Sequence, residues 1–224
     1  MTSSRAVRAP WPLYASLASQ YLPLIAALIG RRQLTRPRLF VILWVGLYIL
    51  MNLLGWVLQA RGINNHFLTP VFTPFQGAAI LWALSLWQTR QVARLTIRLA
   101  IPFFILAWAV FTLTIENLRN FSLAAEPVYS MLALGAAIYT LVARGTDATE
   151  PLTRQDWFWI CGGLSLHFGA LAVVLPLAAG LVESNPEVVI RAYTVRAVIN
   201  TFAFICITIG FLCPKPATLS GRSF

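Results

Sequence analysis

Residues 39–60 read LFVILWVGLYILMNLLGWVLQA, a run without a single charged side chain. An α-helix needs about 20 apolar residues to cross the hydrocarbon core of a lipid bilayer. The run has that length and composition, so it predicts a transmembrane helix. Six further runs predict the same structure: residues 12–30, 70–88, 99–115, 123–143, 157–181 and 193–213. We therefore expect an all-α, polytopic membrane protein, with seven transmembrane helices in one bundle and one domain over residues 1–224.

The composition agrees with a chain that lies mostly within lipid. Of its 224 residues, 58% are hydrophobic and 11% are charged, whereas soluble domains have about 25% charged residues. Seven spans use most of the chain, so no separate soluble catalytic domain is expected. The net charge of +10 comes from residues that flank apolar runs. This placement predicts contacts with the lipid bilayer and its anionic headgroups, and no nucleic-acid partner.

Positively charged side chains alternate between rich and poor loops along the chain. The richer set holds eleven of them: Arg31, Arg32, Arg36, Arg38, Arg90, Arg94, Arg98, Arg144, Arg154, Lys215 and Arg222. The poorer set holds five: Arg5, Arg8, Arg61, Arg119 and Arg191. Loops rich in Arg and Lys stay on the cytoplasmic side of a membrane. The sequence therefore predicts an N-terminus outside and a C-terminus inside the plasma (inner) membrane.

Polar side chains inside the predicted spans concentrate in the outer halves. A charged group at the bilayer centre costs about 2.5–3.5 kcal/mol and normally faces the bundle interior or a cavity. Five of the predicted helices contribute to this layer, which consists of Asn52, Gln76, Glu126, Tyr129, His167, Arg196 and Asn200. A few convergent polar groups in an apolar concavity are typical of a small-molecule site. We therefore expect these residues to line an outward-opening ligand pocket.

Each of these residues also has a structural interpretation. Glu126 and Arg196 are the only opposite charges at comparable depth within the predicted spans, and we expect them to lie near each other. They form either a clamp for a polar or zwitterionic ligand or a structural ion pair, unless Arg196 extends to the outer headgroups. For Asn52, Gln20 and Gln76, hydrogen bonds between helices are favoured over a role in ligand binding. For His167, a neutral ring bonded to a neighbouring helix is favoured over a metal or proton-relay role.

Two prolines, Pro23 and Pro176, fall inside the first and sixth predicted spans. A proline within a helix removes one backbone hydrogen bond, and its ring collides with the carbonyl group four residues earlier. Both spans are therefore expected to kink or to loosen locally. Kinked helices around a polar layer are compatible with a cavity between them.

Several classes of membrane protein are disfavoured by what the sequence lacks. Residues 193–213 contain no lysine, which a retinal Schiff base in the last helix requires. His66 and His167 are the only histidines, and the three cysteines lack the spacing of metal ligands. The chain has no nucleophile-elbow motif and no glycine-rich phosphate loop. The sequence thus indicates no enzyme, no metal and no cofactor.

Three stretches carry a resemblance to a known family: GINNHFLTPVFTPFQ before and within the third predicted helix, EPVYSMLALGAAIY in the fifth, and DWFWICGGLSLHF at the start of the sixth. They resemble small seven-helix membrane proteins that are common in Bacteroidota-type bacteria. The resemblance extends over most of the chain and implies a seven-helix fold, but it implies no particular activity. That family usually has a glutamate at the position of Gln76, so no role that needs a carboxylate is expected there.

Three functions are compatible with these features. The chain is a receptor-like sensor that binds a small ligand and acts through a cytoplasmic signalling protein, a small transporter or channel subunit, or a structural accessory subunit of a membrane complex. A transporter or channel needs a polar path through the inner halves of the helices, and these are nearly apolar. The one-sided polar layer therefore favours a pocket over a path, and with it the sensor over the transporter. The sensor is the preferred hypothesis, but the sequence does not separate it from the accessory subunit.

Overall fold

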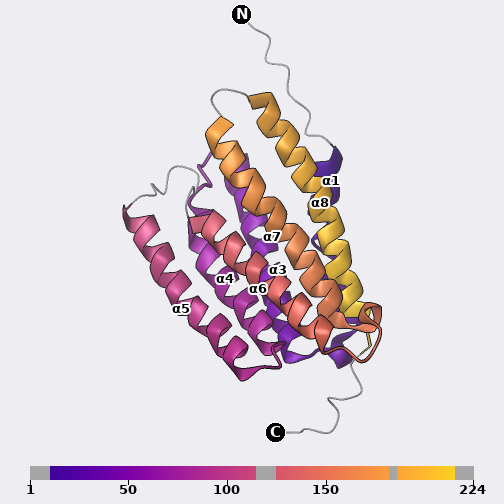
Figure 1. Ribbon diagram of the computed structural model, residues 1–224. Coiled ribbons are helices and arrows are strands. Elements are labelled where there is room, and N and C mark those ends of the chain that lie inside the picture. The colour runs from indigo at the N-terminus through magenta and orange to yellow at the C-terminus, as the bar shows by residue number, and fades with distance from the viewer. Residues whose placement is uncertain (1–10, 115–124, 182–185, 215–224) are drawn as a thin grey trace, which may run out of the picture.

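The computed structural model describes residues 11–114, 125–181 and 186–214, and within these ranges it contains helices and no strand. The helices are α1 (Trp11–Ser19), α2 (Leu22–Ile29), α3 (Arg36–Ala60), α4 (Leu68–Leu86), α5 (Gln91–Thr114), α6 (Ala125–Thr146), α7 (Asp156–Leu181) and α8 (Pro186–Leu212), with the 3-10 turns η1 (Arg31–Gln33) and η2 (Leu152–Arg154). The helices lie side by side with their axes roughly parallel (Figure 1). The expectation of an all-helical chain is confirmed.

Six helical segments in the described ranges are long and apolar enough to cross a membrane: Trp11–Ile29 (α1 with α2), α3, α5, α6, α7 and α8. The chain thus has the helices of a multi-pass membrane protein. The expected span at residues 70–88 corresponds to α4, which is not among the six. Prolines, threonines and Gln76 lower the hydropathy of α4, and its neighbours α3, α5 and α6 cover most of it. A helix that its neighbours shield from lipid can carry such residues.

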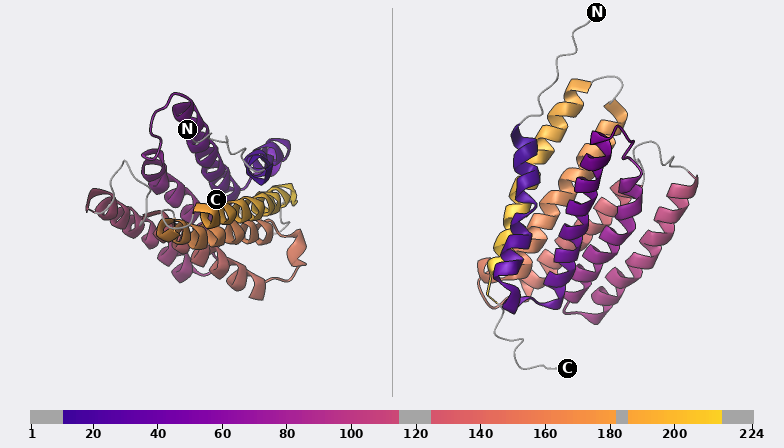
Figure 2. Two further views of the ribbon diagram at one scale, coloured as in Figure 1. Left: turned by 90° about the horizontal axis from the view of Figure 1, so that it is seen from above. Right: turned by 180° about the vertical axis from the view of Figure 1, so that it is seen from behind.

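The helices surround a shared core. Successive helices around this core contact each other: α2 packs against α3, α3 against α4, α4 against α6, α6 against α7, and α7 against α8. Helix α8 also packs against α1 and α2, which closes the ring. Helix α5 lies outside this ring, against α4 and, more sparsely, against α6 (Figure 2). Buried aromatic side chains fill the space enclosed by these helices: Trp44, Tyr48, Tyr129, His167, Phe168 and Phe204. The centre of the molecule is therefore packed with side chains.

The first predicted span is broken, as its proline predicts. Helix α1 ends at Ser19 and α2 begins at Leu22. Pro23 has no N–H to donate to the carbonyl of Ser19, and its ring would collide with that carbonyl in a continuous helix. By contrast, α7 continues through Pro176 without a break.

Two helices begin earlier than hydropathy predicts. Helix α5 starts at Gln91 and α8 at Pro186, whereas the expected spans start at residues 99 and 193. Arg94 and Arg98 therefore belong to a helix and not to the loop expected there. Hydropathy detects the part of a helix that lies in lipid, and arginine is itself a good helix former, so a helix extends beyond its apolar run.

The two ends of the molecule differ in charge. The turn between α4 and α5, η1, η2 and the end of α8 lie at one end, which we call the inner end (Figure 1). The beginning of α1 and the turn between α3 and α4 lie at the opposite, outer end. Most loop arginines of the described ranges are at the inner end, which is the end that the sequence predicts to face the cytoplasm.

Candidate functional site

A cavity of about 510 Å³ opens between α1, α3 and α8 in the outer half of the molecule. We call it the outer pocket. Aromatic rings of Tyr48, Trp56 and Tyr193 form part of its wall. Its polar lining comes from Ser16, Gln20, Asn52, Gln59, Arg196 and Asn200. Amide, hydroxyl and guanidinium groups thus meet aromatic surface in one cavity, the usual composition of a small-molecule site.

The break in the first span shapes one wall of this pocket. Gln20 lies in the break and is buried. Its Oε1 accepts a hydrogen bond of 3.0 Å from Nδ2 of Asn52 on α3. Ser19 turns its hydroxyl back to the carbonyl of Ser16, at 2.8 Å. The wall is therefore a short separate helix, α1, tied to α3 through one amide pair.

Arg196 is the charged residue of the pocket and is half-buried on α8. Its guanidinium carbon lies 5.7 Å from the centre of the Tyr193 ring. Among the residues that the structure describes, none accepts a hydrogen bond from Arg196 or forms an ion pair with it. The guanidinium group has five N–H donors and keeps its charge. The pocket thus contains a cation that can bind an anionic group.

The expected pairing of Glu126 with Arg196 is not among the ion pairs between described residues, which are Arg38–Asp156 and Arg191–Glu187. Tyr193 nevertheless lies within electrostatic reach of both Glu126 and Arg196. Glu126 is in the first turn of α6 and does not line the outer pocket. The two charges therefore occupy the same outer region, and their direct contact stays a prediction.

His167 lies behind the pocket, in the core. Its Nδ1 is 2.6 Å from Oδ1 of Asn200, and because a carbonyl oxygen only accepts, Nδ1 carries the proton. The rings of Trp44 and Phe168 lie 5.2 and 4.9 Å from the imidazole, centre to centre. Since Asn200 also lines the outer pocket, the His167–Asn200 pair joins the pocket to the aromatic core.

Tyr129 and Gln76 are also in the core. The hydroxyl of Tyr129 accepts a 2.9 Å hydrogen bond from Nε1 of Trp44. Nε2 of Gln76 lies 3.7 Å from the sulfur of Met51, a weak acceptor. Of the seven residues expected in one pocket, Asn52, Arg196 and Asn200 line the outer pocket. His167 contacts it through Asn200, whereas Gln76, Glu126 and Tyr129 do not line it.

A buried ion pair at the inner end was missed by the sequence analysis. Arg38 was placed in a loop, but it lies within α3 and is completely buried. Its Nε donates to Oδ2 of Asp156 at 2.8 Å, and its Nη2 donates to the carbonyl oxygen of Cys213 at 2.9 Å. Arg38 and Asp156 each directly precede a predicted span that starts at the inner side. Their equal depth at the inner side is the feature of the sequence from which the ion pair could be predicted.

Among the described residues, no three His, Cys, Asp or Glu side chains come together as a metal-ligand set. Cys161, Cys206 and Cys213 are free thiols. Comparison of the chain with protein-family models, with curated proteins and with solved structures finds no match. No relative therefore assigns a role to Arg196 or to its neighbours, and the chemistry of the outer pocket is the basis for a function.

Proposed function

We propose that this chain is a receptor-like membrane protein that binds a small amphipathic carboxylate in the outer pocket and acts on a cytoplasmic signalling partner. The observation that carries the proposal is Arg196, a half-buried guanidinium with no ion-pair partner among the described residues, in a cavity of about 510 Å³. Known small-molecule sites occupy about 300–1,000 Å³, so the volume is suitable.

The lining favours a ligand with two chemically different parts. A carboxylate matches the planar donor array of Arg196 and can form two parallel hydrogen bonds with it. The amides of Asn52 and Asn200 add donors and acceptors beside it. The rings of Trp56 and Tyr193 offer apolar surface for a hydrocarbon or aromatic body.

Binding can be transmitted through two hydrogen-bonded pairs. On one wall, a ligand that competes for Asn52 frees Gln20 in the break between α1 and α2 and removes the hydrogen bond to α3, so that the packing on α8 is what still holds α1. On the other wall, a change at Asn200 is felt by His167 and by the rings packed around it. This route requires α1 to take up a second position, because coupling between sites needs a two-state element.

The alternatives make different demands on the same structure. A transporter or channel subunit needs a polar path through the inner half. The core there contains Ile160, Leu164, Ile207 and Phe211, each almost fully buried, which favours a pocket over a path. A structural accessory subunit would account for the pairs His167–Asn200 and Trp44–Tyr129, and in it Arg196 would extend to the outer headgroups. The half-buried position of Arg196 in the wall of the outer pocket favours a ligand instead.

The proposal includes the full membrane topology. In it, α1 with α2 forms the first of seven spans and α4 is the third, in one bundle with an extracytoplasmic N-terminus in a bacterial inner membrane. The outer pocket then opens on the extracytoplasmic side, and the arginine-rich inner end is available to a partner in the cytoplasm.

The test uses thermal unfolding of the purified chain in detergent with phenylbutyrate and with its neutral analogue phenylbutyramide. We expect phenylbutyrate to raise the Tm, because a ligand that binds only the folded state stabilises it. The variant Arg196→Gln should lose this shift, and Arg196→Lys should keep part of it. The matched control is Arg191→Gln, since the side chain of Arg191 is 82% exposed and pairs with Glu187 on the same helix.

Equal shifts from the carboxylate and the amide would contradict the proposal, and so would a carboxylate shift that survives in Arg196→Gln. The basal Tm of each variant separates loss of binding from loss of folding. An accessory subunit predicts that neither compound changes the Tm of the wild-type chain.

A further inference from the structure

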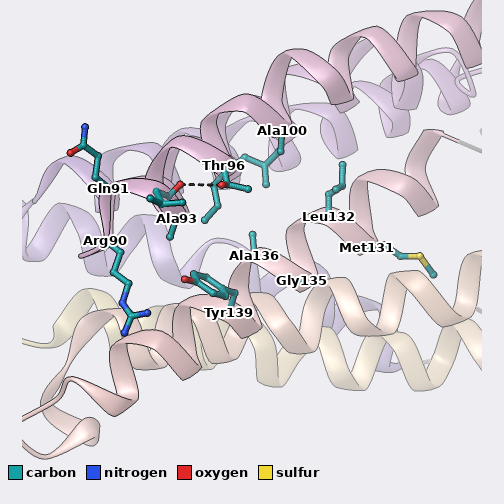
Figure 3. Close-up of a pocket in the computed structure, with 13 residues that line it drawn as sticks. Arg90, Gln91, Ala93, Thr96, Ala100, Met131, Leu132, Gly135, Ala136 and Tyr139 are labelled. Carbon is teal, nitrogen blue, oxygen red and sulfur yellow. Dashed lines mark hydrogen bonds between the residues drawn. The ribbon is translucent and has the colours of Figure 1, made fainter.

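A second cavity lies far from the outer pocket, in the seam between α5 and α6 (Figure 3). Its volume is about 710 Å³, and we call it the α5–α6 groove. Residues 92, 96 and 100 of α5 face residues 131, 135 and 139 of α6, so each helix contributes one face at four-residue spacing. With a rise of 1.5 Å per residue, these faces run for about 12 Å along the helices. The groove is therefore elongated and parallel to the helix axes.

Small side chains give the groove its depth. Ala93 and Ala100 on α5 lie opposite Gly135 and Ala136 on α6. A Cβ atom added to Gly135 would meet no atom within 4 Å. Small residues on facing helices usually allow close packing, yet α5 and α6 make few contacts. The space that these residues leave is thus not filled by the chain itself.

The seam stays open because α5 is fixed to α4 instead. The ring of Phe104 packs directly on Gly77, where a Cβ atom would lie 2.4 Å from it. Nε1 of Trp108 donates a 3.0 Å hydrogen bond to the carbonyl oxygen of Pro70. The guanidinium of Arg98 lies 4.7 Å from the ring centre of Trp82. These contacts hold the middle of α5, from Arg98 to Trp108, against α4.

One end of the groove is basic. Arg90 and the hydroxyl-bearing ring of Tyr139 lie at the inner end of the groove, and Ala100 and Met131 lie towards its other end (Figure 3). Arg90 is exposed and has no ion-pair partner among the described residues. Asp147, which directly follows α6, accepts a 3.3 Å hydrogen bond from the hydroxyl of Thr89, the residue before Arg90. The groove thus has an apolar body and a cationic mouth at the arginine-rich side of the molecule.

We propose that the α5–α6 groove holds one acyl chain of an anionic phospholipid, with Arg90 on its phosphate group. The lips of the groove are apolar and outward-facing, since Val92 is 78% and Met131 60% exposed. An acyl chain is thin enough for a seam of this kind, whereas a partner helix is about 10–12 Å wide. Anionic lipids are concentrated in the cytoplasmic leaflet, where basic sites between helices bind their headgroups. The charge at the mouth therefore selects the lipid, and the groove holds its chain.

The test is native mass spectrometry of the full chain in micelles, with added phosphatidylglycerol or phosphatidylcholine of the same acyl chains. We expect bound phosphatidylglycerol in preference to phosphatidylcholine. Arg90→Gln should weaken phosphatidylglycerol binding about fivefold and phosphatidylcholine binding by less, because the choline cation offsets the charge of the phosphate that phosphatidylcholine also carries. Arg32→Gln, an exposed arginine at the same end, is the matched control and should change neither.

A second pair of variants tests the body of the groove. Gly135→Phe should fill it and lower the binding of both lipids, whereas Gly180→Phe, at a glycine with equal open space on α7, should not. The proposal is overturned if Arg90→Gln behaves like Arg32→Gln, or if Gly135→Phe leaves phosphatidylglycerol bound. It is also overturned if Gly135→Phe turns a dimer into a monomer without loss of lipid, because the occupant is then a second copy of the chain. None of these outcomes depends on a ligand in the outer pocket.

Discussion

At the scale of single residues, the ion pair of Arg38 with Asp156 is the most consequential contact at the inner end. The side chains of both partners are almost fully buried, 0% and 5% exposed. Removing either partner would leave a charge without compensation in a medium where charges are costly. Because Arg38 also bonds the carbonyl oxygen of Cys213, at 2.9 Å, the pair joins α3, α7 and the end of α8. Its geometry therefore fixes how three segments meet.

Changing one partner of this pair should destabilise the chain much more than changing both. We expect Arg38→Met or Asp156→Leu alone to lower the free energy of unfolding by about 3–5 kcal/mol. The double variant should cost less than either single change, since apolar side chains can replace a buried pair without leaving a charge. Unfolding by sodium dodecyl sulfate, monitored by circular dichroism, measures the difference.

The exposed pair Arg191–Glu187 is the matched control for this experiment. Both of its side chains are more than four-fifths exposed, so Arg191→Met should change the free energy of unfolding by less than about 1 kcal/mol. If Arg38→Met behaves like Arg191→Met, the buried pair does not hold the segments together, and the assignment is wrong.

At the scale of helices, glycine positions determine which helices pack closely. A Cβ atom on Gly77 would lie 2.4 Å from the ring of Phe104 on α5. A Cβ atom on Gly163 would lie 2.5 Å from the carbonyl oxygen of Ala203 on α8. Without side chains at these positions, the backbones of α4 and α7 can approach their neighbours. These glycines therefore allow α4 to pack closely on α5 and α7 on α8.

The contact of Gly77 with Phe104 can be tested by adding one methyl group. Gly77→Ala should lower the free energy of unfolding by about 1–3 kcal/mol, because the phenyl ring must move from a packed position. Phe104→Leu in the same chain should restore part of the loss. In contrast, Gly46→Ala should be neutral or stabilising, since a Cβ atom there meets no atom within 4 Å and alanine is the better helix former. Equal effects of Gly77→Ala and Gly46→Ala would contradict the tight contact.

Hydropathy predicts the helices well but not their lengths. Each of the seven apolar runs coincides with helical structure, and the first run is broken before Pro23, as expected. Where a helix continues into polar sequence, as at the start of α5 and α8, the apolar run marks only the part suited to lipid. Helix α4 differs, because its length suits a span but its hydropathy is low. A helix that its neighbours cover does not need the full hydropathy of a span.

The outer pocket could be predicted only in part, because a sequence gives the depth of a residue along a span more readily than its direction around the helix axis. Asn52, Arg196 and Asn200 were placed at one depth, and they line one cavity. Tyr129 has the expected depth, but its hydroxyl faces Trp44 in the core. Gln20 lines the pocket yet was not among the expected site residues, since the break that places it depends on where Pro23 ends α1.

At the scale of the whole molecule, the distribution of arginine predicts which end faces the cytoplasm. Arg61 and Arg191 lie towards the outer end, whereas the described loop and helix-end arginines of the inner end are Arg31, Arg32, Arg36, Arg38, Arg90, Arg94, Arg98, Arg144 and Arg154. The inner end carries the excess, and loops with such an excess stay in the cytoplasm. This prediction places the opening of the outer pocket away from the cytoplasm and Arg90 near the cytoplasmic leaflet.

This orientation can be tested with single cysteines in a chain whose three native cysteines are replaced by alanine. A thiol reagent that cannot cross the membrane should modify Asn64→Cys, in the turn between α3 and α4, from outside intact cells. It should modify Thr146→Cys, at the end of α6, only after the cells are opened. The reverse pattern would place Arg90 at the outer leaflet and the outer pocket towards the cytoplasm. Both proposed sites depend on the side of the membrane that they face. The labelling therefore tests whether the outer pocket can receive a carboxylate from outside the cell and whether the α5–α6 groove can receive an anionic lipid from the inner leaflet.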